Sequence, residues 1–532
     1  MINNPTPVFK FWVPEWLVKV TIFLVVLPSM GLFGLSNANS AVAVGFYGFE
    51  PTDIQYSMVI FYAAVASFFA LERRFFNFVA IKEYMLISAI LQIATSYVCY
   101  ITHNLQVLLV FRFLQGMANC ATTSICITLI FNRLKSERAR EIGYSIFYGM
   151  LLCISQFTLM VTSPVIDAYD YNVLYKAIIF LYLPGTFMLF FMLNNIRLSK
   201  RFPLYQIDWA SFVIYASALC LIGYVLVYGQ QYDWFDDPRI VRSTFGILLL
   251  LTIHVLRQRN MKRPYLTLKV FQYRNFKIGA LLVFVLYICR GAMGITNNYF
   301  GTVLGMDPTH TANLLLINSA GIILSVIISS RFVILQRPMR FIWMAGFIFL
   351  LAFHLWMRLL FSTQANVCEF YIPLFLQGMG AGTLMTPIII FMVSSVPGQL
   401  GGTASATGVF FRFCGFCSSI ALINYFSISK QSEHLNRFQQ SLSALDPTLV
   451  QKLNAYRQML IGKGIAPDRA GNLANVLLSR SVHTQTQLRY AMDYYELISW
   501  LILGIIMLIA LYPYINRTIV NVKTNQPASA SF

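Results

Sequence analysis

Four arginines lie inside long apolar stretches of the sequence, where a charged side chain is unusual: Arg112, Arg290, Arg358 and Arg412. An ionisable residue at membrane depth is costly, and it usually serves a function. Because arginine stays protonated, each of these side chains needs water, a hydrogen-bond acceptor or an anionic partner. Arg358 lies near the end of its stretch and could extend to the membrane surface. The other three are candidates for a functional role, with a structural role in helix packing as the alternative for each.

Carboxylates, the other groups that could carry a proton, lie only at the ends of the apolar stretches. Asp167 follows one stretch and Asp208 precedes another. A proton carrier needs a pKa that burial has raised. Asp167 could be such a group, but an ordinary loop acid is the favoured interpretation. Asp208 could also couple to protons, but it is placed to cap a helix at its N-terminus, which is the favoured role.

A third set of residues could line a substrate cavity. It consists of Asn39, Gln115, Arg290, Asn297, Gln377 and Arg412. A mostly apolar cavity with a few polar groups suits amphiphilic ligands. If several arginines face it, anionic, zwitterionic or neutral substrates are favoured over cations. The nine cysteines lie almost entirely in apolar stretches and form no zinc pattern, so we expect no metal and no cofactor.

The elements that position these residues follow from composition. Of 532 residues, 58% are hydrophobic and 11% are charged, against roughly 25% charged in soluble domains. Apolar runs of about 20 residues span a bilayer as helices, because lipid offers no partners to backbone groups. Fourteen such runs are present, at about 17–44, 54–71, 84–102, 105–130, 142–166, 174–195, 209–229, 241–256, 278–299, 310–330, 341–361, 371–395, 403–428 and 495–515. This pattern excludes a soluble enzyme, a disordered chain and a fibrous repeat.

The loops between these runs alternate in charge. Lysine and arginine follow the even-numbered runs, and mostly acidic residues follow the odd-numbered ones. Basic loops face the cytoplasm, so both termini are predicted to be cytoplasmic. The net charge of +19 is therefore a topology signal, and we expect no nucleic-acid partner. The loop at about 429–490 breaks the alternation, is long, and reads as helical and amphipathic.

One pentapeptide occurs twice. Residues 113–117 and 375–379 both read Phe-Leu-Gln-Gly-Met, in the fourth and twelfth runs. Small residues let helix backbones approach closely. The placement predicts two parallel six-helix halves around an inserted pair, with an N-terminal bundle over 1–195, inserted helices 7–8 within 196–277 and a C-terminal bundle over 278–532. Such a repeat is typical of major facilitator transporters.

At these motifs the chain resembles the fourteen-helix drug:proton antiporters of the major facilitator superfamily (EmrB/QacA type). The resemblance is carried by residues 112–116, 232–236, 273–276 and 377–382, and by Thr403-Ala404-Ser405 with Arg412. The similarity spans nearly the whole chain. It implies an all-α membrane fold with 14 transmembrane helices. It also implies a proton-coupling role for Arg112, and it associates Asp208 with an aspartate at a cytoplasmic helix start.

Three departures weaken the implied proton coupling. Gly34 stands where the family usually has an acid in helix one. The helix-five motif retains only Pro164. The loop motif after helix two keeps only acid-plus-base character, in Glu72, Arg73 and Arg74, which are candidates for a gating loop.

The predicted function is a secondary active transporter of the cytoplasmic (inner) membrane. It would export amphiphilic small molecules by alternating access, coupled to protons. The alternative is a facilitator or carrier of one specific, anionic metabolite without family-type coupling. A membrane enzyme would need converging catalytic groups that the scattered histidines do not provide, and a sensor or scaffold would show no flux. The resemblance also implies a periplasmic adaptor and an outer-membrane channel as partners, with the 429–490 loop either docking the adaptor or capping the cavity.

Overall fold

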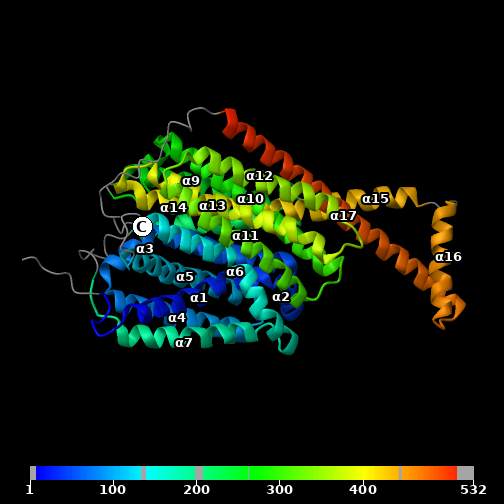
Figure 1. Cartoon of the computed structure of the whole chain (residues 1–532), viewed down its shortest axis with the longest axis horizontal. Coiled ribbons are helices and arrows are strands. Elements are labelled where there is room, and N and C mark those ends of the chain that lie inside the picture. Colours follow the sequence, from blue (N-terminus) through cyan, green and yellow to red (C-terminus); the bar gives the residue numbers. More distant parts are fainter. Residues whose placement is uncertain (1–7, 134–138, 198–207, 262, 443–445, 512–532) are drawn as a thin grey trace, which may run out of the picture.

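The computed structural model describes residues 8–133, 139–197, 208–261, 263–442 and 446–511, and these form a bundle of long helices (Figure 1). The helices of the first half are α1 (Glu15–Ala38), α2 (Ser40–Tyr47), α3 (Pro51–Phe78), α4 (Ile81–Ile101), α5 (Leu105–Arg133), α6 (Ala139–Ala168) and α7 (Val173–Met192). They are followed by α8 (Trp209–Tyr228), α9 (Pro238–Asn260), α10 (Arg274–Thr302), α11 (Pro308–Ile334), α12 (Met339–Leu360), α13 (Tyr371–Ser394), α14 (Gly401–Tyr425), α15 (Gln431–Ser441), α16 (Pro447–Gly462) and α17 (Pro467–Leu511).

Fourteen of the described helices are long and apolar enough to cross a membrane, which confirms the count made from the sequence. Because this number is even, the first span begins and the last span ends on the same side of the bundle, called the termini end below. The opposite side is the loop end. Three helices begin with the same local signal, an aspartate followed by proline. Asp237, Asp307 and Asp446 each accept a hydrogen bond from a backbone N–H in the first turn, and proline at the first position has no N–H to satisfy.

The repeated pentapeptide marks equivalent helix crossings in the two halves. Gly116 on α5 lies against α3, where an added Cβ would be 2.4 Å from the carbonyl oxygen of Phe61. Gly378 on α13 lies against α11, where a Cβ would be 2.1 Å from the carbonyl oxygen of Asn318. Each half thus crosses its second and fourth spans at a glycine, and the fold is two six-helix bundles related by an internal repeat. The boundaries at residues 195 and 277 remain predictions.

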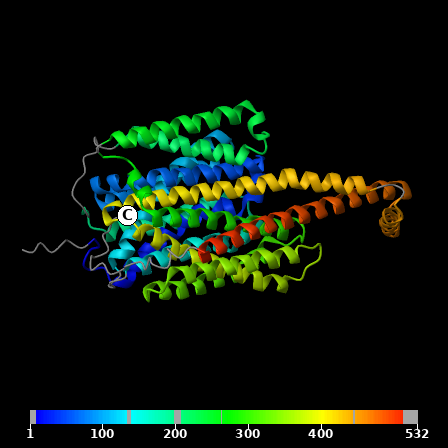
Figure 2. The same cartoon turned by 90° about the horizontal axis from the view of Figure 1, so that it is seen from above.

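The halves meet along two helix pairs, α6 with α11 and α3 with α14. These pairs correspond to each other under the repeat. The inserted helices α8 and α9 form a hairpin along one edge of the bundle, drawn in green at the top of Figure 2. The hairpin contacts both halves, because α8 packs against α3 and against α14. Of the fourteen spans, α13 is the most buried and α9 the least.

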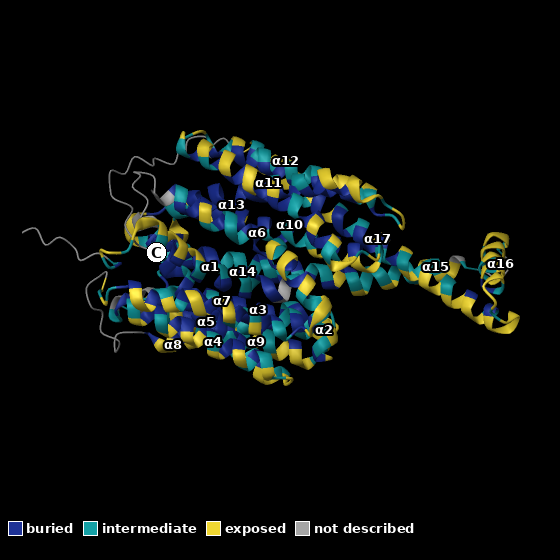
Figure 3. Cartoon of the chain, turned by 60° about the horizontal axis from the view of Figure 1, so that its bottom comes forward, coloured by how far each residue is buried: buried dark blue, intermediate teal, exposed yellow. Residues whose placement is uncertain are grey.

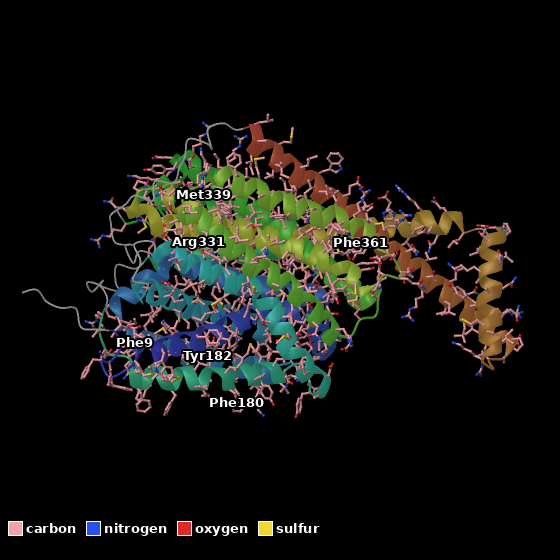
Figure 4. The ribbon with its side chains drawn as sticks, in the orientation of Figure 1. Phe9, Phe180, Tyr182, Arg331, Met339 and Phe361 are labelled. Carbon is pink, nitrogen blue, oxygen red and sulfur yellow. The ribbon has the colours of Figure 1, made fainter. Side chains whose placement is uncertain are left out.

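The outer helices have an exposed apolar face that points away from the bundle and a buried face that packs against it. On α7, Phe180 points away from the bundle and is 60% exposed, whereas Tyr182 points toward it and is buried (Figure 4). The Tyr182 hydroxyl donates a hydrogen bond to Ser29 Oγ on α1 at 2.9 Å. Exposed phenylalanine suits a lipid-facing surface, because lipid tails are as apolar as the side chain.

A helical arm extends beyond the bundle at the loop end (Figures 1 and 3). It consists of α15, α16 and the first part of α17, which packs on both. A small apolar cluster centred on Leu460, Ala470 and Ala474 joins α16 to α17. His434 and Asp493 join α15 to α17, with 2.7 Å between Nε2 and Oδ2. The loop predicted to be helical at about 429–490 does contain helices in its described residues. The last span begins 28 residues before the predicted position because α17 runs unbroken from Pro467.

Candidate functional site

A cavity lies between the two halves, in the part of the bundle nearer the termini end. Its empty space amounts to about 950 Å3, including the part open to solvent. Helices α1, α3, α5 and α6 line it from one half, and α10, α13 and α14 line it from the other. Most of the lining is apolar or aromatic, with Phe33, Phe69, Phe147 and Met392 as examples.

One charged side chain, Arg412 on α14, lines this cavity. Its guanidinium carbon lies 5.4 Å from the centre of the Tyr148 ring on α6. The phenol groups of Tyr62 on α3, Tyr148 and Tyr287 on α10 interact electrostatically with Arg412, and those of Tyr148 and Tyr287 also hydrogen-bond it. All three line the cavity. Within the described part of the chain, no carboxylate forms an ion pair with Arg412.

Two amide pairs join the halves on the loop-end side of the cavity. Asn318 Nδ2 on α11 donates to two acceptors of α13, Leu374 O at 2.8 Å and Gln377 Oε1. Its Oδ1 must therefore accept, and Gln156 Nε2 on α6 donates to it at 2.9 Å. At the other half–half interface, Asn424 Nδ2 on α14 donates to Gln55 Oε1 on α3 at 2.9 Å. These two loop-end amide pairs link the halves at both interfaces.

Arg112 lies inside the first half and does not line the cavity. It is buried on α5, and its Nη1 donates to Gln115 Oε1 one turn further on at 2.8 Å. Gln115 Nε2 in turn donates a hydrogen bond to Ser96 Oγ on α4 at 3.0 Å. The guanidinium also lies over the Phe61 ring, 4.7 Å from its centre. Gln115 is thus a partner of the arginine, and its amide is not available to a ligand.

Glu72 is buried near the termini end of α3 and contacts the cavity wall indirectly. Ser124, which lines the cavity, donates a hydrogen bond to Glu72 Oε2 at 2.9 Å. The buried Tyr84 and Cys120 interact electrostatically with the Glu72 carboxylate. The side chains of Arg73 and Arg74, the other two gating-loop candidates, lie outside the described residues.

The two aspartates singled out by the sequence occupy different surroundings, and neither contacts Arg112. Asp208 caps α8 by accepting from the Ser211 N–H at 3.1 Å, and it pairs with Arg257 Nη2 at 3.0 Å. Burial raises the pKa of this carboxyl, but the hydrogen bonds from Ser211 and the Arg257 guanidinium outweigh it, so its pKa lies below the usual range. Asp208 is therefore ionised and paired. Asp167 is exposed at the loop end of α6.

Asn39 separates α1 from α2 and ties this break to α6. Its Nδ2 donates to Leu35 O at 3.0 Å, and its Oδ1 accepts from Thr162 at 3.1 Å. Gly34 of α1 is also buried against α6. An added Cβ there would be 2.9 Å from Thr158 Oγ1. The position where the resembled family has an acid is thus a tight helix–helix contact in this chain.

We therefore expect that Gly34→Asp does not create a proton site but separates α1 from α6. The variant should lose several degrees of melting temperature and gain no substrate-linked proton movement, because overpacking a tight contact costs about 1–3 kcal/mol. Gly31→Asp is the matched control, since an added Cβ at Gly31 meets nothing within 4 Å. A Gly34→Asp protein that melts like Gly31→Asp would contradict this packing.

The remaining cavity candidates have other positions. Arg290 on α10 lies 5.5 Å from the centre of the Tyr287 ring and close to Cys153 of α6. The Oδ1 of Asn297 is buried and has no partner in the described part of the chain. Gln377 bonds Asn318, as given above. Of the six candidates Arg412 alone is among the residues that line the cavity, and the three tyrosines around it carried no sequence signal that separates them from the other tyrosines.

Two halves related by an internal repeat around a central cavity define a class of transport protein, and the chain belongs to that class, the Major Facilitator Superfamily. The family's sequence model matches residues 21–421. Among curated relatives, the multidrug export protein EmrB of Haemophilus influenzae is 21% identical over 374 residues, which cover 68% of this chain and 70% of the relative. The colistin resistance protein EmrB of Acinetobacter baumannii is 23% identical over 413 residues, or 76% and 78% of the two chains. The resemblance to EmrB-type proteins is thereby confirmed.

Solved structures share the fold. The peptide transporter POT superposes with a TM-score of 0.59 at 14% identity, covering 95% of this chain and 96% of that one. The nucleoside transporter NupG superposes with a TM-score of 0.53 at 9% identity, covering 92% and 99%. With fourteen spans and these relatives, the protein is a multi-pass membrane transporter.

Proposed function

We propose that the protein exports amphiphilic small molecules from the cytoplasm by alternating access through the central cavity. The observation that carries this proposal is the cavity itself, which is apolar, is shared by both halves and lies on one side of the loop-end amide pairs. Substrate would enter from the termini end, which the basic loops assign to the cytoplasm. Rocking of the halves would then break the amide pairs and open the loop end. The EmrB-type relatives, named for multidrug export, support the direction.

We further propose that export is coupled to protons through Arg112 and Glu72. Arg112 supplies a fixed charge inside the first half, where its position matches the resembled family. Glu72 is a buried carboxylate that Ser124 connects to the cavity wall. Neither Asp167, which is exposed, nor Asp208, which is ion-paired, has comparable surroundings. A proton taken up by Glu72 would change the charge at the edge of the cavity as substrate leaves.

The test is flux in liposomes that contain a pH-sensitive dye, with an imposed proton gradient and a panel of anionic and cationic amphiphiles. Substrate should trigger proton movement in the wild type. Arg112→Ala and Glu72→Gln should each lower the rate by about 100-fold, since proton transfer by a positioned group contributes roughly 10²–10⁴-fold. Arg358→Ala is the matched control, because Arg358 pairs with Glu496 at 2.8 Å on the outer helices.

One observation favours a second function, an uncoupled carrier of an anionic metabolite. An acid at Gly34, where the resembled family has one, would have to displace the Thr158 hydroxyl, and within the described residues the cavity lining contains no carboxylate. Substrate movement without any proton signal, equally fast in Glu72→Gln, would establish this carrier and remove the proton-coupled one.

A further inference from the structure

We propose that Arg412, surrounded by the phenol groups of Tyr62, Tyr148 and Tyr287, is the head-group site for an amphiphile that bears one anionic group, such as a carboxylate or sulfonate. The proposal rests on the transport function proposed for the cavity, and it names the class of substrate. It concerns how the ligand is recognised, and it holds for a proton-coupled exporter and for an uncoupled carrier alike.

The first argument is the missing counter-charge. A guanidinium in an apolar environment needs acceptors for its five N–H groups. Its partners in the protein include three phenol groups, which can accept a hydrogen bond but offer no carboxylate. The described part of the chain offers no carboxylate to Arg412. Arg112 is different, because it lies outside the cavity lining and donates to Gln115. Arg412 hydrogen-bonds two of these phenol groups instead of a carboxylate, and an anion in the cavity can take their place as a bidentate partner.

The second argument is that the cavity has one charged side chain among mostly apolar lining residues. Much of the cavity lining besides Arg412 and the tyrosines is apolar, with Val65, Leu151, Val283, Ile389 and Val409 among it. A ligand whose anionic group meets Arg412 would place its apolar body against these side chains. Burial of that body supplies affinity with little selectivity, whereas the charged contact sets orientation and sign. A cationic amphiphile would meet like charge at Arg412, and no carboxylate is among the described residues that line the cavity.

The third argument is that the site is assembled from both halves. Arg412 and Tyr287 belong to the second half, while Tyr62 and Tyr148 belong to the first. An anion at Arg412 would replace the phenol groups as its partner and so change the attraction between the halves. Binding at this site therefore acts on the same contact that must open and close during transport.

The experiment uses three probes with one body and three charges: 2-naphthoate, 2-naphthamide and 2-naphthylmethylammonium. Radiolabelled 2-naphthoate is bound to the purified full-length protein by equilibrium dialysis, with protein-free micelles as the blank, and the other two compete. We expect the anion to bind at least about 10-fold more tightly than the amide, and the ammonium to compete least. A hydrogen bond to a charged group contributes about 1.5–3 kcal/mol, which corresponds to roughly 10- to 100-fold.

Variants assign the preference to the residue. Arg412→Met should lower 2-naphthoate affinity by about 10- to 100-fold and abolish the preference over 2-naphthamide. Arg412→Lys keeps the charge but loses the planar guanidinium. It should retain part of the 2-naphthoate affinity and part of the preference over 2-naphthamide. If Arg412→Met does not fold, this variant tests the head-group site instead. Arg290→Met is the matched control, since Arg290 lies on a helix of the same half but outside the cavity lining.

The outcomes separate this proposal from the transport function. Equal affinity for the three probes, a preference for the ammonium, or full anion preference in Arg412→Met would overturn the head-group site and leave export by the cavity standing. Anion-selective binding that depends on Arg412, in a protein that moves none of the probes across liposomes, would support the site and contradict the proposed export.

Discussion

Replacing Gly378 by leucine should prevent the second half from folding, and Gly116→Leu should do the same to the first. At both positions even a Cβ would lie within 2.4 Å of a backbone carbonyl oxygen of the crossing helix. Backbone cannot move aside as the end of a flexible side chain can. The helices would have to separate along their length, which forfeits the packing on which helix association in membranes depends. We expect a loss of several kcal/mol, above the usual overpacking cost of about 1–3 kcal/mol.

The measurement is the yield of monodisperse protein and its melting temperature in detergent. Gly504→Leu provides the matched control, because Gly504 is exposed on α17 and an added Cβ there meets nothing within 4 Å. This control should behave like the wild type. Equal melting of Gly378→Leu and Gly504→Leu would show that α11 and α13 do not cross at this glycine.

The second large effect concerns the loop-end amide pairs. The double variant Gln55→Leu and Gln156→Leu removes one partner from each half–half interface. Hydrogen bonds between membrane helices contribute about 0.6 kcal/mol on average. Asn318 Oδ1 also loses its donor, and Asn424 Nδ2 loses one of its two acceptors, which adds to the loss. Together these terms favour the state open at the loop end by about tenfold or more.

Cys153 reports this opening. It is buried on α6 one turn before Gln156, with its Sγ 3.9 Å from Ser319 O on α11. In a Cys368→Ser background, which removes the exposed thiol, a membrane-impermeant maleimide added from the loop side should label Cys153 about tenfold faster in the double variant. Gln92→Leu serves as the control, because Gln92 bonds Thr122 within one half. Unchanged labelling of Cys153 would mean that the amide pairs do not hold the halves together.

The fold could be predicted because its signals are local. Each span is a continuous apolar run, and the recurring Phe-Leu-Gln-Gly-Met marks equivalent crossings that the structure confirms through Gly116 and Gly378. The course of the arm was harder to predict from the sequence, because nothing in residues 467–494 distinguishes a separate helix from the start of α17. The inserted hairpin was predicted as a pair of helices, but its contact with both halves depends on packing that sequence does not encode locally.

The site was less predictable, since membership of the cavity depends on which face of each helix points inward. Gln115 and Gln377 are polar residues in apolar spans, which suggested ligand contact, yet both bond to neighbouring protein groups. Tyr62, Tyr148 and Tyr287 come from three helices far apart in the sequence, and only the folded bundle gathers them around Arg412. Arg412 itself could be found, because a charge in an apolar run requires a polar surrounding.

The unbroken course of α17 has a mechanical consequence. The part before residue 488 lies outside the main apolar core and belongs to the arm, and its 21 residues from Pro467 span about 30 Å at 1.5 Å per residue. This stiff rod continues directly into a span of the second half. Each degree by which that half tilts moves the far tip by about half an ångström. The arm is thus a lever that converts small rotations inside the bilayer into displacements at its tip beyond the loop end.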